Sequence, residues 1–294
     1  MSRADLDTIK KISLQSKEYP AILKEIHDCP KELFIKGEII EQDKTAIGIV
    51  GTRKYSQYGK QVTLDIAGDL AKLGITIVSG LARGIDTFAH QAALENKGRT
   101  IAVLGSGLDK KSFFPSSNYH LGEKISQHGA VISEYPPGVW GTHFTFPQRN
   151  RIISGLSLGV VVIEAPEKSG ALITAALALE QDREVFAIPG SIYEKNSRGT
   201  NQLIKLGAKV VTDVEDILDE LNLSHLLKTK RREIMPETKE EEIIFSVLSL
   251  QPMHIDEIIK KSGLPTSAVN STLMILELKK SVRNLGKGNY VLCD

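Results

Sequence analysis

The sequence predicts a doubly wound α/β domain with a mostly parallel sheet, followed by a small domain of three helices and a hairpin. Between about residues 45 and 221, short β-branched runs recur, and helix-length segments separate most of them. The runs are apolar at successive positions, which is typical of strands covered on both faces. After residue 237 the pattern changes to three helical segments and two short strands, as in a winged helix.

The expected elements follow in order along the chain. In the first domain, strands are expected at 46–50, 75–78, 100–104, 130–132, 160–163, 185–188 and 209–211. Helices are expected between them at 57–73, 85–95, 116–127, 171–181 and 201–206. In the second domain, helices are expected at 240–250, 255–262 and 266–280, with strands at 282–285 and 289–292.

Changes in composition define the domain boundaries. Residues 1–43 form a short N-terminal appendage, in which a helix from Pro20 and a strand at 33–37 hold too little apolar surface to fold alone. Residues 44–222 form the α/β domain and residues 238–294 the winged-helix domain. Residues 223–237 are a linker. For its basic residues we favour a solvated hinge over a DNA clamp; these residues are Lys228, Lys230, Arg231 and Arg232.

The composition is that of an ordinary globular protein. The 294 residues are 41% hydrophobic and 25% charged, and the net charge is +1, so any nucleic-acid site needs a local concentration of cations. Cys29 and Cys293 have no metal-ligand spacing, which indicates a reducing compartment, structural thiols and no metal site. No run reaches the roughly 18 apolar residues of a membrane span, and the N-terminus lacks a signal core. We therefore expect a cytoplasmic protein with no membrane partner.

Glycine-rich turns follow the predicted strands, at the carboxyl edge where doubly wound sheets bind ligands. In the first, Gly51-Thr52-Arg53-Lys54, glycine lets the backbone approach an anion, and the next helix adds its positive N-terminal dipole. The turn lacks the third glycine of the dinucleotide fingerprint, and no acidic residue closes the next strand. We therefore expect neither NAD nor another cofactor.

Asp86 and His90 lie one turn apart at the start of the helix expected at 85–95. They could act as acid and base, or they could cap and orient the preceding turn. We favour the second interpretation, because no Ser or Cys nucleophile of a known motif accompanies them, and we expect no catalytic residue. A residual activity stays open, since Glu134 and Glu164 are expected at the same edge.

The loop after the fourth strand interleaves aromatic and basic residues, among them Phe144, Phe146, Arg149 and Arg151. Single-stranded nucleic acid suits such a loop, because bases stack on rings while phosphates pair with guanidinium groups. In the structural alternative, Pro147 begins a helix whose arginines form salt bridges at the sheet edge, and the phenylalanines pack in the core. Both interpretations stay open.

The turn after the fifth strand places Ser169 and Gly170 where a helix begins. Free backbone N–H groups there could bind a phosphate, or Ser169 could be an ordinary N-cap. Acidic residues crowd the segment 213–220, whereas several cations are expected on the carboxyl-edge loops. The domain should therefore have a positive rim.

Several long motifs resemble those of the DprA/Smf family in order and wording. They are GTR at 51–53, SGLARGID at 79–86, FPQRNRIISGLS at 146–157, KSGALITA at 168–175 and PGS at 189–191. The similarity covers about residues 19–221 and extends to the C-terminal module. Many relatives have serine where this chain has Thr52, and the segment before residue 45 is shorter than the N-terminal helical domain of longer members.

The resemblance implies an extended Rossmann-like domain that binds single-stranded DNA and forms a homodimer. It also implies a protein that protects incoming DNA and loads the RecA recombinase in natural transformation, with single-strand-binding protein as a further partner. No established catalytic reaction is implied. From the motifs and the glycine turns, we assign DNA binding to Gly51, Thr52, Arg53, Lys54, Ser79, Gly80, Arg83, Gly84, Phe144, Phe146, Arg149, Asn150, Arg151, Lys168, Ser169 and Gly170.

Two other function classes stay open. A nucleotide-binding enzyme or sensor of the Lonely-Guy/lysine-decarboxylase-like Rossmann group would use the same glycine rim, but Pro189-Gly190-Ser191 lacks that group's Pro-Gly-Gly-x-Gly-Thr motif. A protein adaptor would depend on the winged helix, whose third helix has no arginine in its first turns, so we favour protein contact or weak DNA binding there.

For the leading class, we expect charge reversal at Arg53 or Arg149 to weaken oligo-dT binding by more than about tenfold and to leave the fold intact. If about 4 to 6 phosphates are neutralised, affinity should fall with log salt at roughly −0.7 per contact.

Overall fold

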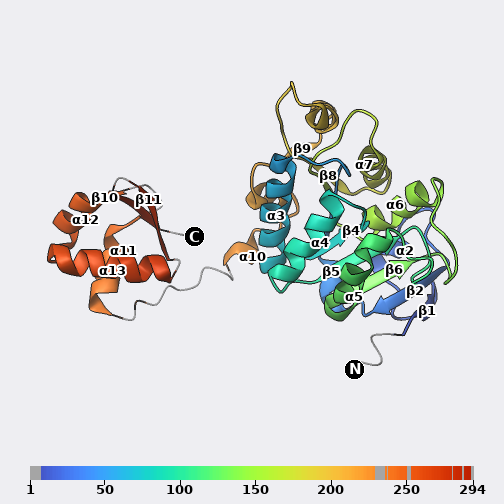
Figure 1. The fold of residues 1–294 in the computed structure, drawn as a ribbon, viewed down its shortest axis with the longest axis horizontal. Helices are drawn as coiled ribbons and strands as arrows, with labels where there is room; N and C mark the ends of the chain where they lie inside the picture. The colour runs from blue at the N-terminus through green and yellow to red at the C-terminus, as the bar shows by residue number, and fades with distance from the viewer. Residues whose placement is uncertain are drawn as a thin grey trace. The chain divides into compact units, whose positions relative to one another are not determined.

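The computed structural model describes residues 8–228, 236, 238–249, 253–279, 281–286 and 288–292. The chain forms two compact units, Met1–Ser224 and His225–Asp294 (Figure 1). Cys293 and the predicted linker residues Lys230, Arg231 and Arg232 lie outside the described residues.

The first unit is built on one nine-stranded sheet with the strand order β1-β2-β6-β5-β4-β3-β7-β8-β9. Its strands are β1 (Lys10–Ser13), β2 (Glu32–Gly37), β3 (Ala46–Val50), β4 (Thr76–Ser79), β5 (Thr100–Leu104), β6 (Gly129–Ser133), β7 (Gly159–Val162), β8 (Glu184–Ala187) and β9 (Lys209–Val210). From β6 to β9 along this order all neighbours are parallel, which confirms the mostly parallel sheet.

Helices cover both faces of the sheet. α3 (Gln57–Lys72), α4 (Ile85–Glu95) and α5 (Tyr119–His128) lie in one layer, and α6 (Thr145–Gly155) packs against α7 (Gly170–Glu180) (Figure 1). Alternate residues of β5 face the two layers, since Val103 belongs to the core with α6 and α7 and Leu104 to the core with α5. The chain therefore changes faces between β6 and β7, and the switch point of the sheet lies between β3 and β7.

The shorter elements complete this unit. They are α2 (Ala21–Lys24), η1 (Glu41–Lys44), η2 (Ser116–Asn118), η3 (Lys195–Ser197), α8 (Arg198–Lys205) and α9 (Val214–Glu220), and α10 (His225–Lys228) opens the second unit. The predicted strands and helices of the α/β domain are all present, with ends shifted by a few residues. The helix expected at 116–127 divides into η2 and α5.

The N-terminal residues extend the sheet, which the sequence does not predict. β1 pairs with β2 and β2 pairs with β6, both antiparallel, from Phe34 opposite Ser133 to Gly37 opposite Ala130. The chain then lies against α6, where a Cβ added at Gly155 would be 2.8 Å from Leu23. Glycine at this position thus lets the N-terminal segment approach α6 closely.

The second unit has its own apolar core and confirms the winged helix. Its helices are α11 (Lys239–Val247), α12 (Ile255–Ser262) and α13 (Thr266–Leu278), and its strands β10 (Met253–His254), β11 (Val282–Gly286) and β12 (Asn289–Leu292) pair in the order β10-β12-β11. The outer face of α13 exposes Met274, Ile275 and Leu278. Within the described ranges, every helix is too short or too polar to cross a lipid bilayer.

Asp86 and His90 of α4 have separate structural partners. Asp86 accepts hydrogen bonds from the backbone N–H groups of Gly80 and Ala82, at 3.2 and 3.4 Å, and so orients the turn after β4. His90 Nδ1 lies 2.6 Å from Thr100 Oγ1. That hydroxyl donates its one proton to the Ile77 carbonyl, so it must accept from the His90 ring. These contacts agree with orienting roles for both side chains.

The His90 ring is held neutral in the core. Its Nε2 has no hydrogen-bond partner among the described residues. Burial, which deprives the protonated ring of its hydration, and the charge of Arg149 together lower the pKa of His90 to about 3.

Acid should therefore destabilise the first unit through His90. Because the pKa of the ring is lower in the folded than in the unfolded chain, the unfolded chain binds an extra proton between about pH 6.5 and 3. This contribution to stability is complete above pH 6.5 and is lost as pH falls, by up to about 1.4 kcal/mol per pH unit. Denaturant titrations followed by circular dichroism should show a smaller pH dependence for His90→Gln than for the wild type. Parallel curves for the two proteins would contradict the buried neutral ring.

Candidate functional site

A groove lies at the switch point of the sheet. It consists of a pocket of about 540 Å³ and a neighbouring pocket of about 370 Å³. Four residues line both pockets, namely Arg53, Ala82, Phe146 and Arg149. The groove is thus formed by the loops after β3, β4 and β7 together with the start of α6, as expected for the carboxyl edge of a doubly wound sheet.

The turn between β3 and α3 forms one wall. Gly51 is required by packing, since a Cβ there would lie 2.6 Å from Ile85 of α4. The Thr52 N–H donates to the Glu164 carbonyl at 2.8 Å, and the Thr52 hydroxyl accepts from the Lys54 N–H at 3.1 Å. These contacts fix the backbone that carries Arg53 and Lys54 into the larger pocket. Among the residues that the structure describes, neither cation has an ion-pair partner.

Two phenylalanines form the aromatic part of the groove. The Arg53 guanidinium lies 5.8 Å from the centre of the Phe146 ring, and that ring lies 5.2 Å from the Phe114 ring. Phe114 and Pro115 line the smaller pocket and are missing from the sequence-based assignment. The neighbouring Phe113 is buried, so a sequence pattern does not reveal which of the two rings faces the groove.

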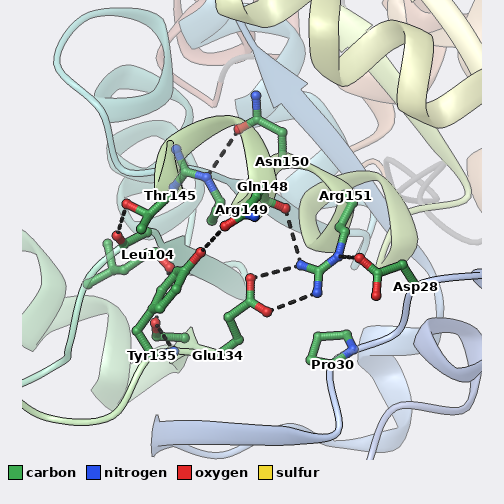
Figure 2. Close-up of polar contacts among 12 residues, drawn as sticks. Asp28, Pro30, Leu104, Glu134, Tyr135, Thr145, Gln148, Arg149, Asn150 and Arg151 are labelled. Atoms are coloured by element: carbon green, nitrogen blue, oxygen red, sulfur yellow. Dashed lines mark hydrogen bonds and ion pairs between the residues drawn. The ribbon is translucent and has the colours of Figure 1, made fainter. Parts of the chain in front are cut away.

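Arg149 is buried behind the groove surface. Its Nη1 donates to the carbonyls of Gly80, at 2.7 Å, and Val103. Its Nε donates to the Asn150 side chain at 3.2 Å (Figure 2). Burial lowers the pKa of Arg149 to about 10, and the nearby Asp86 opposes this shift. Burial likewise raises the pKa of Asp86, against the charge of Arg149.

This environment corrects one expectation. A reversed charge at Arg149 would place a carboxylate against two carbonyl oxygens and beside Asp86, and both carbonyls would lose the hydrogen bond from the guanidinium. Arg149→Glu should therefore disturb the fold, contrary to the expectation from the sequence. Only part of the guanidinium lines the groove, because the residue is 6% exposed.

Arg151 lies outside the groove lining and is held by carboxylates. Figure 2 shows its guanidinium between Glu134, at 2.8 and 2.9 Å, and Asp28, at 3.0 Å. Both of these ion pairs match the structural alternative, in which an arginine of this helix forms salt bridges at the sheet edge. The pKa of Arg151 is raised by the hydrogen bonds and the charges of the two carboxylates, which together outweigh its burial.

The turn between β7 and α7 forms the opposite wall. Ser169 is the N-cap of α7, since its hydroxyl accepts from the Ala171 N–H at 3.3 Å. Gly170 leaves open space, with no atom within 4 Å of an added Cβ. Lys168 lines the same pocket and forms no ion pair within the described part of the chain. Ser169 therefore caps α7 and lines the groove at the same time.

The structure brings most of the assigned residues together. The groove is lined by Gly51, Thr52, Arg53, Lys54, Gly80, Arg83, Phe146, Arg149, Asn150, Lys168, Ser169 and Gly170. Outside it lie Ser79, Gly84, Phe144 and Arg151. Ser79 is buried and donates to the Ile49 carbonyl, Gly84 supplies a φ of +88° before α4, and Phe144 is exposed beside His143. His143, Pro166 and Thr174 line the larger pocket without having been assigned.

Carboxylates near this edge are engaged in structural contacts. Glu164 accepts from the Ser56 N–H at 2.9 Å and from the Ser56 hydroxyl, and Glu134 pairs with Arg151. Among the described residues, no three His, Cys, Asp or Glu side chains are grouped so as to hold a metal ion.

Comparisons with known proteins identify relatives. A family model described as DNA recombination-mediator protein A matches residues 10–222, and one described as DprA winged helix domain matches residues 228–288. The DNA processing protein DprA of Bacillus subtilis (strain 168) is 47% identical over 214 residues, which cover 72% of this chain and 71% of that protein.

Two solved structures are also similar. DNA processing protein A from Streptococcus pneumoniae has 44% identity and a TM-score of 0.68, covering 74% of this chain and 76% of its own. DNA processing protein A from Helicobacter pylori, solved to study its single-stranded DNA binding mode, has 31% identity and a TM-score of 0.64, covering 72% of this chain and 96% of its own.

The Arg151–Glu134 pair should contribute to stability. The Arg151 and Glu134 side chains are only 13% and 19% exposed, so Arg151→Ala leaves a shielded carboxylate unpaired and should cost about 2–3 kcal/mol of unfolding free energy. Asp28→Ala is the matched control, because the Asp28 side chain is 80% exposed and its pairing should contribute under about 1 kcal/mol. In a double-mutant cycle with Glu134→Ala, additive losses would show that the pair has no coupling.

Proposed function

The chain belongs to the DNA recombination-mediator protein A family, and on that premise we propose that its groove binds single-stranded DNA. We further propose that the protein protects incoming DNA and loads RecA recombinase onto it during natural transformation and recombination. The proposal includes a homodimer that acts in the cytoplasm, exchange with single-strand-binding protein, and no catalytic reaction.

The observation that carries the proposal is the convergence of unpaired cations beside an aromatic ring. Arg53, Lys54 and Lys168 come from two loops that are far apart in sequence and line one pocket with Phe146; none of the three has an ion-pair partner in the described part of the chain. A polynucleotide strand offers both partners for this surface, since its phosphates attract the cations and its bases stack on a ring. The family likeness to the Helicobacter pylori protein supports the same ligand.

The groove chemistry favours a strand over a dinucleotide cofactor. The β3–α3 turn lacks the dinucleotide fingerprint, and the buried acid beside it, Asp86, is occupied by the Gly80 and Ala82 N–H groups. The helix start at Ser169 and Gly170 adds N–H donors for phosphate without demanding a particular base. The expected binding is therefore independent of sequence and sensitive to salt.

Charge reversal at Arg53 should weaken DNA binding without unfolding the protein. The guanidinium lines both pockets and has no ion-pair partner among the described residues, so Arg53→Glu replaces an attraction for phosphate by a repulsion. Fluorescence polarisation with labelled oligo-dT should show a loss of more than about tenfold at low salt. The slope of log affinity against log salt should become shallower by about 0.7 for each phosphate that the variant no longer neutralises.

Lys72→Glu is the control for this experiment. Lys72 lies in the last turn of α3, away from the Ser56 end that borders the groove, and it is exposed. This variant should bind oligo-dT as the wild type does. Equal binding by Arg53→Glu, a flat salt response of the wild type, or displacement of oligo-dT by mononucleotides would contradict the proposal.

A further inference from the structure

The loop between β8 and η3 exposes an apolar tip. Tyr193 is 87% exposed and Ile192 is 73% exposed, the former being the most exposed large hydrophobic residue of the described chain. Large apolar side chains that are exposed next to one another can mark an interaction site. Nothing in the groove described above accounts for these two residues.

The base of this loop is tied down at several points. Asn201 of α8 donates to the Gly190 carbonyl at 2.9 Å and accepts from the Gly190 N–H at 3.3 Å. A Cβ at Gly190 would lie 2.2 Å from the Ser197 hydroxyl, so the two ends of the loop cross closely there. The Tyr58 hydroxyl donates to the Pro189 carbonyl at 2.8 Å. The apolar tip is therefore presented on an anchored loop.

The short helix η3, which directly follows this loop, adjoins the groove. The Asn196 side chain donates to the Lys54 carbonyl at 2.7 Å, and the Asn196 carbonyl accepts from the Ala165 N–H at 2.7 Å. Lys54 lines the larger pocket, as does Pro166, the residue after Ala165. Tyr193 and Asn196 are three residues apart, so their backbones are at most about 11 Å apart. Three stacked nucleotides of a strand span about the same distance.

The charges next to the loop suit a polyanion only modestly. Lys54 and Lys195 have no ion-pair partner among the described residues, whereas Glu194 is exposed and Arg198 lies 3.6 Å from Glu167. A strand passing the loop would thus find few phosphate partners there. The bases of a strand, in contrast, could stack on the Tyr193 ring and on the half-exposed ring of Tyr58, since every base has a face that can stack.

We propose that Tyr193 is a stacking platform for a base of the same single strand, beyond the groove and next to the Lys54 edge. This inference rests on the proposed function, because it assumes that a strand occupies the groove. It assigns a ligand class, the base of a single-stranded polynucleotide, to a loop outside the groove lining, and it predicts a binding site longer than the two pockets alone.

Strand length separates this proposal from the groove itself. Wild type and Tyr193→Ala should be compared with oligo-dT of about 6 and about 15 nucleotides, lengths that bracket a groove-sized and an extended site. Tyr193→Ala should bind the longer strand about five- to fiftyfold more weakly and the shorter strand as the wild type does. The salt slope for the longer strand should stay unchanged, because stacking involves no phosphate contact. Tyr193→Phe should restore the binding.

Leu179→Ala is the matched control. Leu179 is also an exposed apolar residue, but it lies near the end of α7 opposite to Gly170, and its replacement should change the binding of neither strand.

Unchanged binding of the longer strand by Tyr193→Ala would overturn the platform, while salt-dependent binding of the shorter strand would still support the groove. A weaker affinity for both lengths, or a change in oligomeric state by light scattering with DNA binding intact, would also overturn the platform. Wild-type protein that binds neither strand would contradict the proposed function as well.

Discussion

The buried Arg149 guanidinium is the group on which the site depends. It bonds carbonyls at the ends of two neighbouring strands and lies beside Asp86, whose carboxylate holds the turn after β4. A charge in this position is tolerated only because carbonyl dipoles and a carboxylate replace its hydration. Gly80 is part of the same arrangement, since a Cβ there would lie 2.6 Å from the guanidinium. Arg149 thereby fixes the start of α6 to the ends of β4 and β5, and the groove surface lies over these contacts.

The net charge is close to zero, but the basic residues fall into two groups with different surroundings. Arg99, Arg151 and Arg183 each pair with a carboxylate and join distant segments of the chain. Arg53, Lys54 and Lys168 have no such partners among the described residues and lie at one edge of the sheet. A field that can attract a polyanion thus arises from placement and not from an excess of positive residues.

The sequence predicts the sheet and most of the groove because both follow from short-range patterns. β-branched runs mark the strands from β3 to β9, and the parallel order brings the loops after them to one edge. It does not distinguish Arg149 from Arg151. At 3.6 residues per turn the two lie about 200° apart around α6, so one enters the strand ends while the other meets Glu134, and only the rotation of the helix decides which. The sequence does not predict β1 either. This strand has four residues and only one buried side chain, so its alternation of apolar and polar residues is too short to recognise.

The antiparallel edge of the sheet has a consequence for how the chain reaches its native state. β2 precedes its partner β6 by about a hundred residues, so the pairing closes one of the longest loops in the first unit. During synthesis the early strands leave the ribosome well before the segment that they pair with, and Leu33 and Ile35, buried in the finished protein, must wait in water or in transient contacts. β2 is thus made well before the strand with which it pairs.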